Sequence, residues 1–159
     1  MKTYQACWGR PLVIVSAILT VVCLGITWAL WWVPREAGAL ALLLRWLPLA
    51  LLAGCLPFMI RGYAIADDAI LVKRLFWTTR MARAGLMSAE VVPKAMCKSL
   101  RTCGNGGGFS FTGWYWSKAL GHYRAFVTDL NSTVVLRFKK RNVVISPAAP
   151  DEFVRDLLG

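Results

Sequence analysis

Residues 11–33 read PLVIVSAILTVVCLGITWALWWV and contain no charged side chain. At about 1.5 Å per residue, a helix of this length reaches roughly 34 Å, which is enough to cross a hydrocarbon core of about 30 Å. A soluble core helix is rarely so long without a charge. The stretch therefore predicts a transmembrane span. Its length and the tryptophans at its end argue against a cleaved signal peptide.

A second apolar segment at residues 40–60 predicts a return span that closes a helical hairpin, with a tight turn at 33–39. Arg45 interrupts this segment near its start, and we expect its side chain to extend to the interface beside Trp46. Small residues recur four apart in both spans, where they either allow close helix approach or merely fill lipid-facing space. They are Gly25, Ala29, Ala50 and Gly54.

Basic residues gather on one side of the two spans. Lys2 and Arg10 precede the first span, and Arg61 begins a strongly basic segment after the second. The connecting turn holds Arg35 with Glu36 against it. Because cytoplasmic flanks carry an excess of Lys and Arg, both termini are expected in the cytoplasm.

The chain as a whole is apolar and basic. Its 159 residues are 57% hydrophobic and carry a net charge of +11, with fifteen Lys and Arg against seven Asp and Glu after residue 60. Beside a lipid bilayer this surplus predicts adhesion to anionic headgroups, and nucleic acid is set aside as a partner. The five cysteines are an odd number and two lie in apolar segments, so neither a disulfide framework nor a metal site is expected.

Beyond residue 60 the hydrophobic period changes to two, which predicts a mainly β domain at 61–159. Asp67 and Asp68 mark a turn in the first hairpin. Residues 85–92 fit either a short helical turn or an irregular strand. The chain is expected to end in a helix that starts at Pro150 and buries Phe153 and Leu157. The expected strands lie at 63–65, 69–75 and up to Met81, and then at 122–128, 134–139 and 143–146 as a meander.

The densest glycine segment, CGNGGG at 103–108, does not fit a phosphate-binding loop. The pattern GxGxxG would need glycine where Phe109 stands, and GxxxxGK[ST] would need a lysine. We interpret the segment as a flexible loop between strands. His122 is the only histidine, and no nucleophile elbow is present. We therefore assign no catalytic residue and no cofactor, and we predict a non-enzymatic protein; a hydrolase using this loop is a distant alternative.

The densest basic patch is expected at a hairpin tip and consists of Arg137, Lys139, Lys140 and Arg141. No acidic residue lies between Asn131 and Pro150 to pair with it locally. The patch is either a solvated surface that protects a sheet edge or a contact for anionic lipid or an acidic partner.

The run FVTDLNSTVVLRFKKRNVVISPAAPDEFVRDLL at 126–158 resembles the bacterial pleckstrin-homology domain family, in a small form anchored by two N-terminal transmembrane helices. Its most specific piece is VVISP, followed by Pro150, Asp151 and Phe153. The resemblance covers about residues 62–158. It implies a seven-stranded, strongly bent β-barrel-like sandwich that the C-terminal helix closes at one end.

The same resemblance implies a binding or scaffolding module that acts through protein contacts or homo-oligomer formation. The alternative is a sensor of anionic lipid or its headgroups at the inner-membrane surface. Phosphoinositide-binding members place Lys and Arg around the first hairpin loop, but this chain has Asp67 and Asp68 there. That departure argues against an inositol-phosphate pocket at the first loop.

Overall fold

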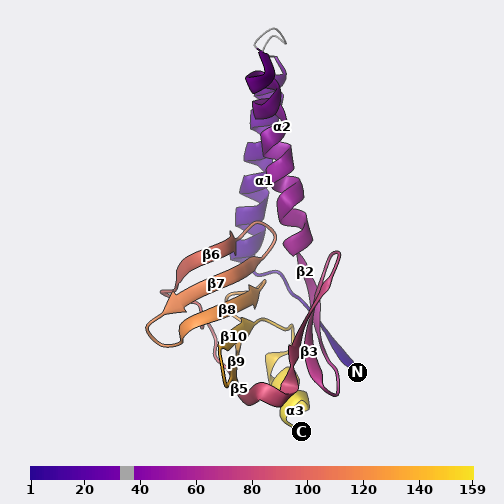
Figure 1. The fold of residues 1–159 in the computed structure, drawn as a ribbon, viewed down its shortest axis with the longest axis vertical. Coiled ribbons are helices and arrows are strands. Elements are labelled where there is room, and N and C mark those ends of the chain that lie inside the picture. Colours follow the sequence, from indigo (N-terminus) through magenta and orange to yellow (C-terminus); the bar gives the residue numbers. More distant parts are fainter. Residues whose placement is uncertain (33–37) are drawn as a thin grey trace.

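The computed structural model describes residues 1–32 and 38–159, and most of the turn predicted at 33–39 lies outside them. Two long helices stand on a mainly β domain, and both chain ends lie at the end of the molecule that holds this domain (Figure 1). The helices are α1 (Arg10–Trp31) and α2 (Gly38–Cys55), and the 3-10 turn η2 (Leu56–Phe58) continues α2 toward the sheets.

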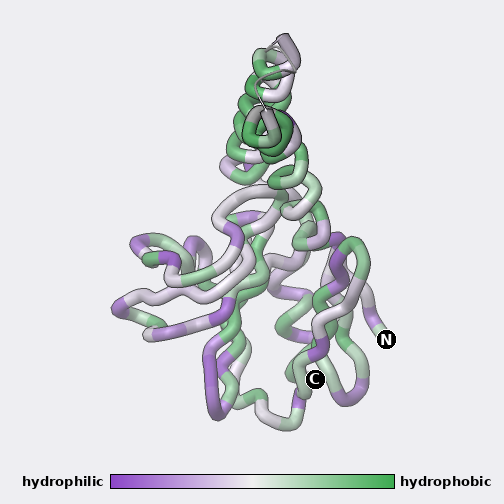
Figure 2. The backbone as a smooth tube through the Cα atoms, turned by 45° about the horizontal axis from the view of Figure 1, so that its top comes forward, coloured by the Kyte–Doolittle hydropathy of each residue, from purple (hydrophilic) through white to green (hydrophobic). Residues whose placement is uncertain are grey.

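Both helices are long and apolar enough to cross a membrane. Only 17% and 12% of their most apolar windows are buried inside the molecule, whereas the core helix of a soluble protein is mostly buried. Figure 2 shows hydrophobic residues along most of their length. The second predicted span is too long at its end, because Ile60 belongs to a strand and its side chain is buried in the β core.

The β domain consists of two sheets. The first has the antiparallel order β1-β2-β3-β4, and the second has the order β5-β9-β10-β8-β7-β6. The described residues form ten strands, whereas the resemblance implies seven; the segment before α1 and the glycine-rich segment each contribute a strand that the sequence did not predict. The strands are β1 (Lys2–Gln5), β2 (Ile60–Ile65), β3 (Ala69–Arg74), β4 (Thr78–Ala82), β5 (Leu86–Val91), β6 (Leu100–Gly106), β7 (Phe111–Ser117), β8 (Gly121–Val127), β9 (Val134–Phe138) and β10 (Asn142–Ile145).

The predicted strands are confirmed at the first hairpin and in the last third of the chain. Of the ambiguous residues 85–92, Gly85 ends the short turn η3 (Arg83–Gly85) and residues 86–91 form β5. The prediction that the last three strands form a meander is wrong. β10 lies between β9 and β8 and runs parallel to β8, with Val144 opposite Ala125. Three consecutive apolar side chains of β10 are fully buried, which is typical of a central strand covered on both faces.

The C-terminal helix α3 (Pro150–Leu158) is confirmed. Pro150 starts it, and Phe153 and Leu157 are buried against the core between the sheets. Tyr63 lies in the same core with no exposed surface, and its hydroxyl donates to the carbonyl oxygen of Phe126 at 2.7 Å. The core therefore includes a buried polar group whose hydrogen bond is satisfied.

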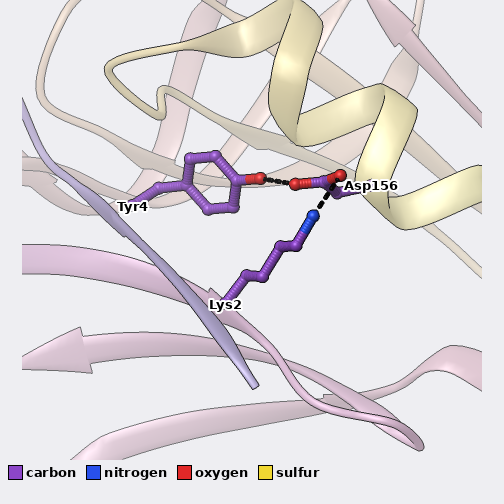
Figure 3. A network of polar contacts seen from close by, with 3 residues as sticks. All are labelled: Lys2, Tyr4 and Asp156. Carbon is purple, nitrogen blue, oxygen red and sulfur yellow. Dashed lines mark hydrogen bonds and ion pairs between the residues drawn. The ribbon is translucent and has the colours of Figure 1, made fainter.

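Strand β1, which the sequence did not predict, ties the start of the chain to its last helix (Figure 3). Lys2 Nζ lies 2.7 Å from Asp156 Oδ1, and the Tyr4 hydroxyl donates to the other carboxylate oxygen. The Tyr4 ring also packs edge-on against Phe153, with the centroids 5.1 Å apart. Hydrogen bonds from Lys2 and Tyr4 lower the pKa of Asp156, because they stabilise its charged form.

Two observations bear on the expectations for the helical hairpin. The guanidinium of Arg45 donates to the carbonyl oxygen of Leu30 at 3.0 and 3.2 Å, near the end of α1, and it lies 5.4 Å from the Trp31 ring centre. This arrangement satisfies the buried charge within the hairpin. A Cβ added at Gly25 or Gly54 would meet no atom within 4 Å, so these glycines do not form a close helix contact.

Candidate functional site

The glycine-rich segment is not a flexible loop. It forms the end of β6 and the turn to β7, and this turn docks on α1. Ser16 Oγ donates to the carbonyl oxygen of Gly107 and accepts from the backbone N–H of Phe109, both at 3.1 Å. On the other side, Ser110 Oγ donates to the carbonyl oxygen of Phe58 at 2.8 Å. The hairpin therefore holds both helices to the β domain.

Glycine is needed in this turn because the chains approach closely. A Cβ at Gly107 would lie 2.9 Å from Val15 Cγ1, and the residue has φ +125°, which side chains rarely adopt. A Cβ at Gly108 would lie 3.1 Å from Cys55 Sγ. The glycines thus serve packing against the helices rather than phosphate binding by a loop.

A cavity of about 550 Å³ lies beside this turn, where α2 meets the two sheets. Arg74 from β3, Arg101 from β6 and Arg124 from β8 line it, and we call it the arginine pocket. Its walls include the aromatic rings of Phe58, Trp77 and Trp114. Within residues 1–32 and 38–159, no Asp or Glu lines the cavity. Positive charge is therefore concentrated here without a local counter-charge.

Arg74 is the most buried of the three arginines, with only 6% of its surface exposed. Its guanidinium carbon lies 5.6, 5.4 and 5.1 Å from the ring centres of Phe58, Trp77 and Phe126. These rings stabilise the cation through their faces. Among the described residues, its Nε is the single buried side-chain nitrogen or oxygen without a hydrogen-bond partner. A buried donor of this kind is costly unless something binds it.

Arg124 and Arg101 complete the positive wall. The guanidinium of Arg124 lies 4.9 Å from the Phe126 ring centre, so Arg124 and Arg74 contact the same ring. A Cβ at Gly106 would overlap the guanidinium of Arg101. The absence of a side chain at Gly106 therefore leaves the space that the Arg101 guanidinium occupies. None of the three arginines takes part in the ion pairs found among the described residues.

Burial and mutual repulsion act on these arginines. Burial, and then the nearby Arg124, lower the pKa of Arg74, while burial and then Arg141 lower the pKa of Arg124. The ordinary pKa of arginine is far above neutral pH, so both groups remain charged at neutral pH. The repulsion and desolvation would be relieved by an anion in the cavity.

The predicted basic patch lies elsewhere. It forms the tip between β9 and β10 beside η3, where the backbone N–H of Lys139 donates to Gly85 at 3.0 Å. Lys139, Lys140 and Arg141 border a second cavity of about 460 Å³, whereas Arg137 lies 3.8 Å from Glu90 across the sheet. The other end of β9 lies near the start of α1, so this tip is at the opposite end of its hairpin (Figure 1). An anionic contact by this patch stays a prediction.

The remaining sequence candidates lie outside the arginine pocket. His122 is exposed on β8 opposite Trp116, and Asp68 pairs with Arg80 beside the first hairpin turn. In the part of the chain that the structure describes, no three His, Cys, Asp or Glu side chains are grouped to hold a metal ion. The chemistry available at the pocket is therefore anion recognition by arginines.

Sequence reasoning missed the arginine pocket, although a local signal was present. In β3, Arg74 follows Ile70 and Val72 at two-residue spacing, and both of these side chains are fully buried. In β8, Arg124 precedes buried Phe126 by two residues. Because side chains alternate across a strand, each arginine lies on a core-facing row. An arginine in such a row is the signal that could have found the site.

Comparison with known proteins agrees with the fold. The family model described as "Bacterial PH domain" matches residues 61–159, which is more than half of the chain. No curated protein and no solved structure matches the chain.

Proposed function

Because the chain belongs to the bacterial PH domain family, we propose that it is a membrane-anchored, non-enzymatic binding module of the bacterial inner membrane. Domains of this kind are generally binding modules rather than enzymes. In this proposal α1 and α2 cross the bilayer, residues 61–159 form the cytoplasmic domain, and the arginine pocket is its binding site. The strand β1 joins that domain from the chain before α1.

The single observation that carries the proposal is the fixed junction between the helices and the β domain. The β6–β7 turn is hydrogen-bonded to α1 through Ser16 and to η2 through Ser110. The arginine pocket lies at this junction and includes Gly54 and Cys55 of α2 in its lining. A ligand in the pocket would therefore lie where the helices leave the domain, at the membrane surface.

Exposed aromatic side chains support this position of the membrane surface. Phe76 and Trp77 form the tip between β3 and β4 and are 73% and 43% exposed, and Trp77 packs edge-on against Phe58 beside α2. Trp8, before α1, contacts Phe109 in the docked turn. Aromatic residues of this type favour the membrane–water interface. Trp28, Trp31 and Trp32 gather at the other end of α1 in the same way.

The anchoring is tested by washing membranes that contain the full chain with alkaline carbonate and with high salt. We expect the protein to stay in the membrane pellet and to be released only by detergent, because two apolar helices are not removed by screening charge. Release by salt or carbonate would overturn the membrane-spanning assignment.

Contact with a protein partner or a second copy of the chain is the second candidate function. The cavity beside the β9–β10 tip favours it, because three basic side chains there border apolar Met81 and Phe138. That combination suits a segment with acidic and apolar side chains. A partner that copurifies in fixed stoichiometry from detergent-solubilised membranes, and is lost in a variant with Lys139, Lys140 and Arg141 changed to Gln, would support it.

A further inference from the structure

We propose that the arginine pocket binds the phosphate of an anionic lipid headgroup, with the lipid's acyl chains lying along α2. This inference rests on the proposed membrane anchoring and names the ligand class of the same site. The first argument is the buried donor. Arg74 is 6% exposed and lines the cavity, and its Nε has no partner among the described residues. The planar guanidinium of a cavity-lining arginine matches the oxygens of a phosphate.

The charge of the pocket selects an anion. Three arginines line one cavity of about 550 Å³, and no carboxylate of the described residues lies in its wall. A zwitterionic headgroup would bring an ammonium group for which the pocket offers no partner of opposite charge. An anionic headgroup avoids this mismatch, so the pocket is expected to prefer phosphatidylglycerol over phosphatidylcholine.

The position of the pocket favours a lipid over a soluble phosphate ester. Gly54 of α2 lies in its lining and has open space around its Cα. Leu51 and Leu47 are three and seven residues before Gly54, on the same side of the helix, and both are more than half exposed. Because Gly54 has no side chain, it would not block a lipid whose glycerol backbone leaves the pocket. The acyl chains would then lie on the apolar surface of α2.

The test uses the full chain in an uncharged detergent, with binding followed by native mass spectrometry. Short-chain phosphatidylglycerol, short-chain phosphatidylcholine and glycerol 3-phosphate are titrated separately. We expect saturable binding of phosphatidylglycerol at least about tenfold tighter than that of phosphatidylcholine. Each of Arg124→Gln and Arg101→Gln should weaken it by about tenfold, because each removes one charge-assisted contact.

A matched control removes the same kind of charge elsewhere. The variant with Arg137, Lys139 and Lys140 changed to Gln loses three charges at the β9–β10 tip but should bind phosphatidylglycerol within about twofold of the original protein. Arg141 is kept in this control because it interacts electrostatically with Arg124. The binding result for Arg74→Gln is interpreted only if the circular dichroism spectrum of this variant matches that of the original protein. Arg101 is exposed, so Arg101→Gln tests the pocket and leaves the core intact.

The outcomes separate the possibilities. Equal binding of the two lipids, or equal loss in the tip control and the pocket variants, would overturn the headgroup site. Tighter binding of glycerol 3-phosphate than of phosphatidylglycerol would overturn the lipid assignment. Carbonate release of a protein that still binds phosphatidylglycerol in detergent would refute the membrane-spanning function and not the pocket. A protein that stays in the membrane but shows no lipid preference would refute the pocket alone.

Discussion

Phe153 attaches the C-terminal helix to the rest of the domain. Its side chain has no exposed surface, and it contacts Tyr4 of β1 as well as the main core. Removing a fully buried phenyl ring leaves a cavity that the surroundings fill only in part. We expect Phe153→Ala to lower the free energy of unfolding by about 3–5 kcal/mol, measured by denaturant unfolding of the full chain in micelles.

Leu158 provides the control on the same helix, because 58% of its surface is exposed. Leu158→Ala should change the free energy of unfolding by less than about 0.5 kcal/mol. A loss below about 1 kcal/mol for Phe153→Ala would show that the helix is not docked through this residue.

Tyr63 gives stability a dependence on alkaline pH. Burial raises the pKa of its phenol to about 12, against an ordinary value of 10.0. The folded protein therefore holds this proton more tightly than the unfolded chain, so the contribution is fully present below about pH 10 and is lost as pH rises through about 12. The shift corresponds to about 2–3 kcal/mol. We expect the free energy of unfolding to fall across this window.

Tyr63→Phe should flatten that fall, although Tyr4 and Tyr115, whose pKa values are also raised to about 12, would still contribute. The variant is compared with the original protein by denaturant unfolding at several alkaline pH values, and an ultraviolet titration of tyrosinate gives the pKa directly. If the free energy of unfolding of the variant fell with pH as steeply as that of the original protein, Tyr63 would ionise without opening the core.

At the scale of the single residue, the sequence predicted the apolar anchors and missed the buried charge. The burial of Phe153 and Leu157 was predicted correctly, because a short helix with a single apolar row packs that row against the core. Arg74 was not interpreted as buried because arginine is rarely buried. Its stabilisation by Phe58, Trp77 and Phe126 depends on segments distant in the chain, which no local pattern contains.

At the scale of the element, the β6–β7 turn is the part whose glycines are explained by packing. Gly107→Ala would place a methyl group 2.9 Å from Val15 Cγ1 and impose strain at φ +125°. In the original protein the backbone N–H of Phe109 is hydrogen-bonded to Ser16. We expect the turn to undock in the variant, so that this N–H exchanges its hydrogen faster. Hydrogen exchange with mass spectrometry on residues 107–110 measures this change.

Two further variants separate steric clash from backbone strain. Gly121→Ala introduces a methyl group at φ +65° with no atom within 4 Å, so it should leave exchange at 107–110 unchanged. Adding Val15→Ala to Gly107→Ala removes the clashing methyl group and should restore part of the protection. Equal exchange in all of these proteins would mean that the turn is not held against α1.

The elements also show where sequence patterns are insufficient. Glycine at 104, 106 and 107 indicated a loop, yet β6 extends through Gly106 because its partner strand β7 supplies the hydrogen bonds. In the same way, the short β1 exists because the edge of β2 was free to accept it. Both outcomes depend on pairing with a distant strand, whereas the periodic strands β3, β8 and β9 were predicted from their own side chains.

At the scale of the whole molecule, the structure relates the two ends of the chain. β1 precedes α1 and pairs with β2, which follows α2, so the chain before the first helix and the domain after the second lie at the same end of the hairpin. The ion pair between Lys2 and Asp156 strengthens this connection. If the helices cross a membrane, both ends must lie on one side of it, whichever side that is.

The choice of side is the last prediction. Lys2 before α1, Arg10 at its first position and the surplus of Lys and Arg after residue 60 favour the cytoplasm. Cys7, Cys97 and Cys103 are exposed at the domain end, whereas Cys23 and Cys55 lie in the helices. A membrane-impermeant maleimide should therefore label the protein in inverted inner-membrane vesicles and not in intact spheroplasts. A variant with these three exposed cysteines changed to serine should not be labelled in either, and a reporter fused after Gly159 should be active only in the cytoplasm. Labelling in spheroplasts that disappears in the triple variant would place the domain in the periplasm and reverse the orientation.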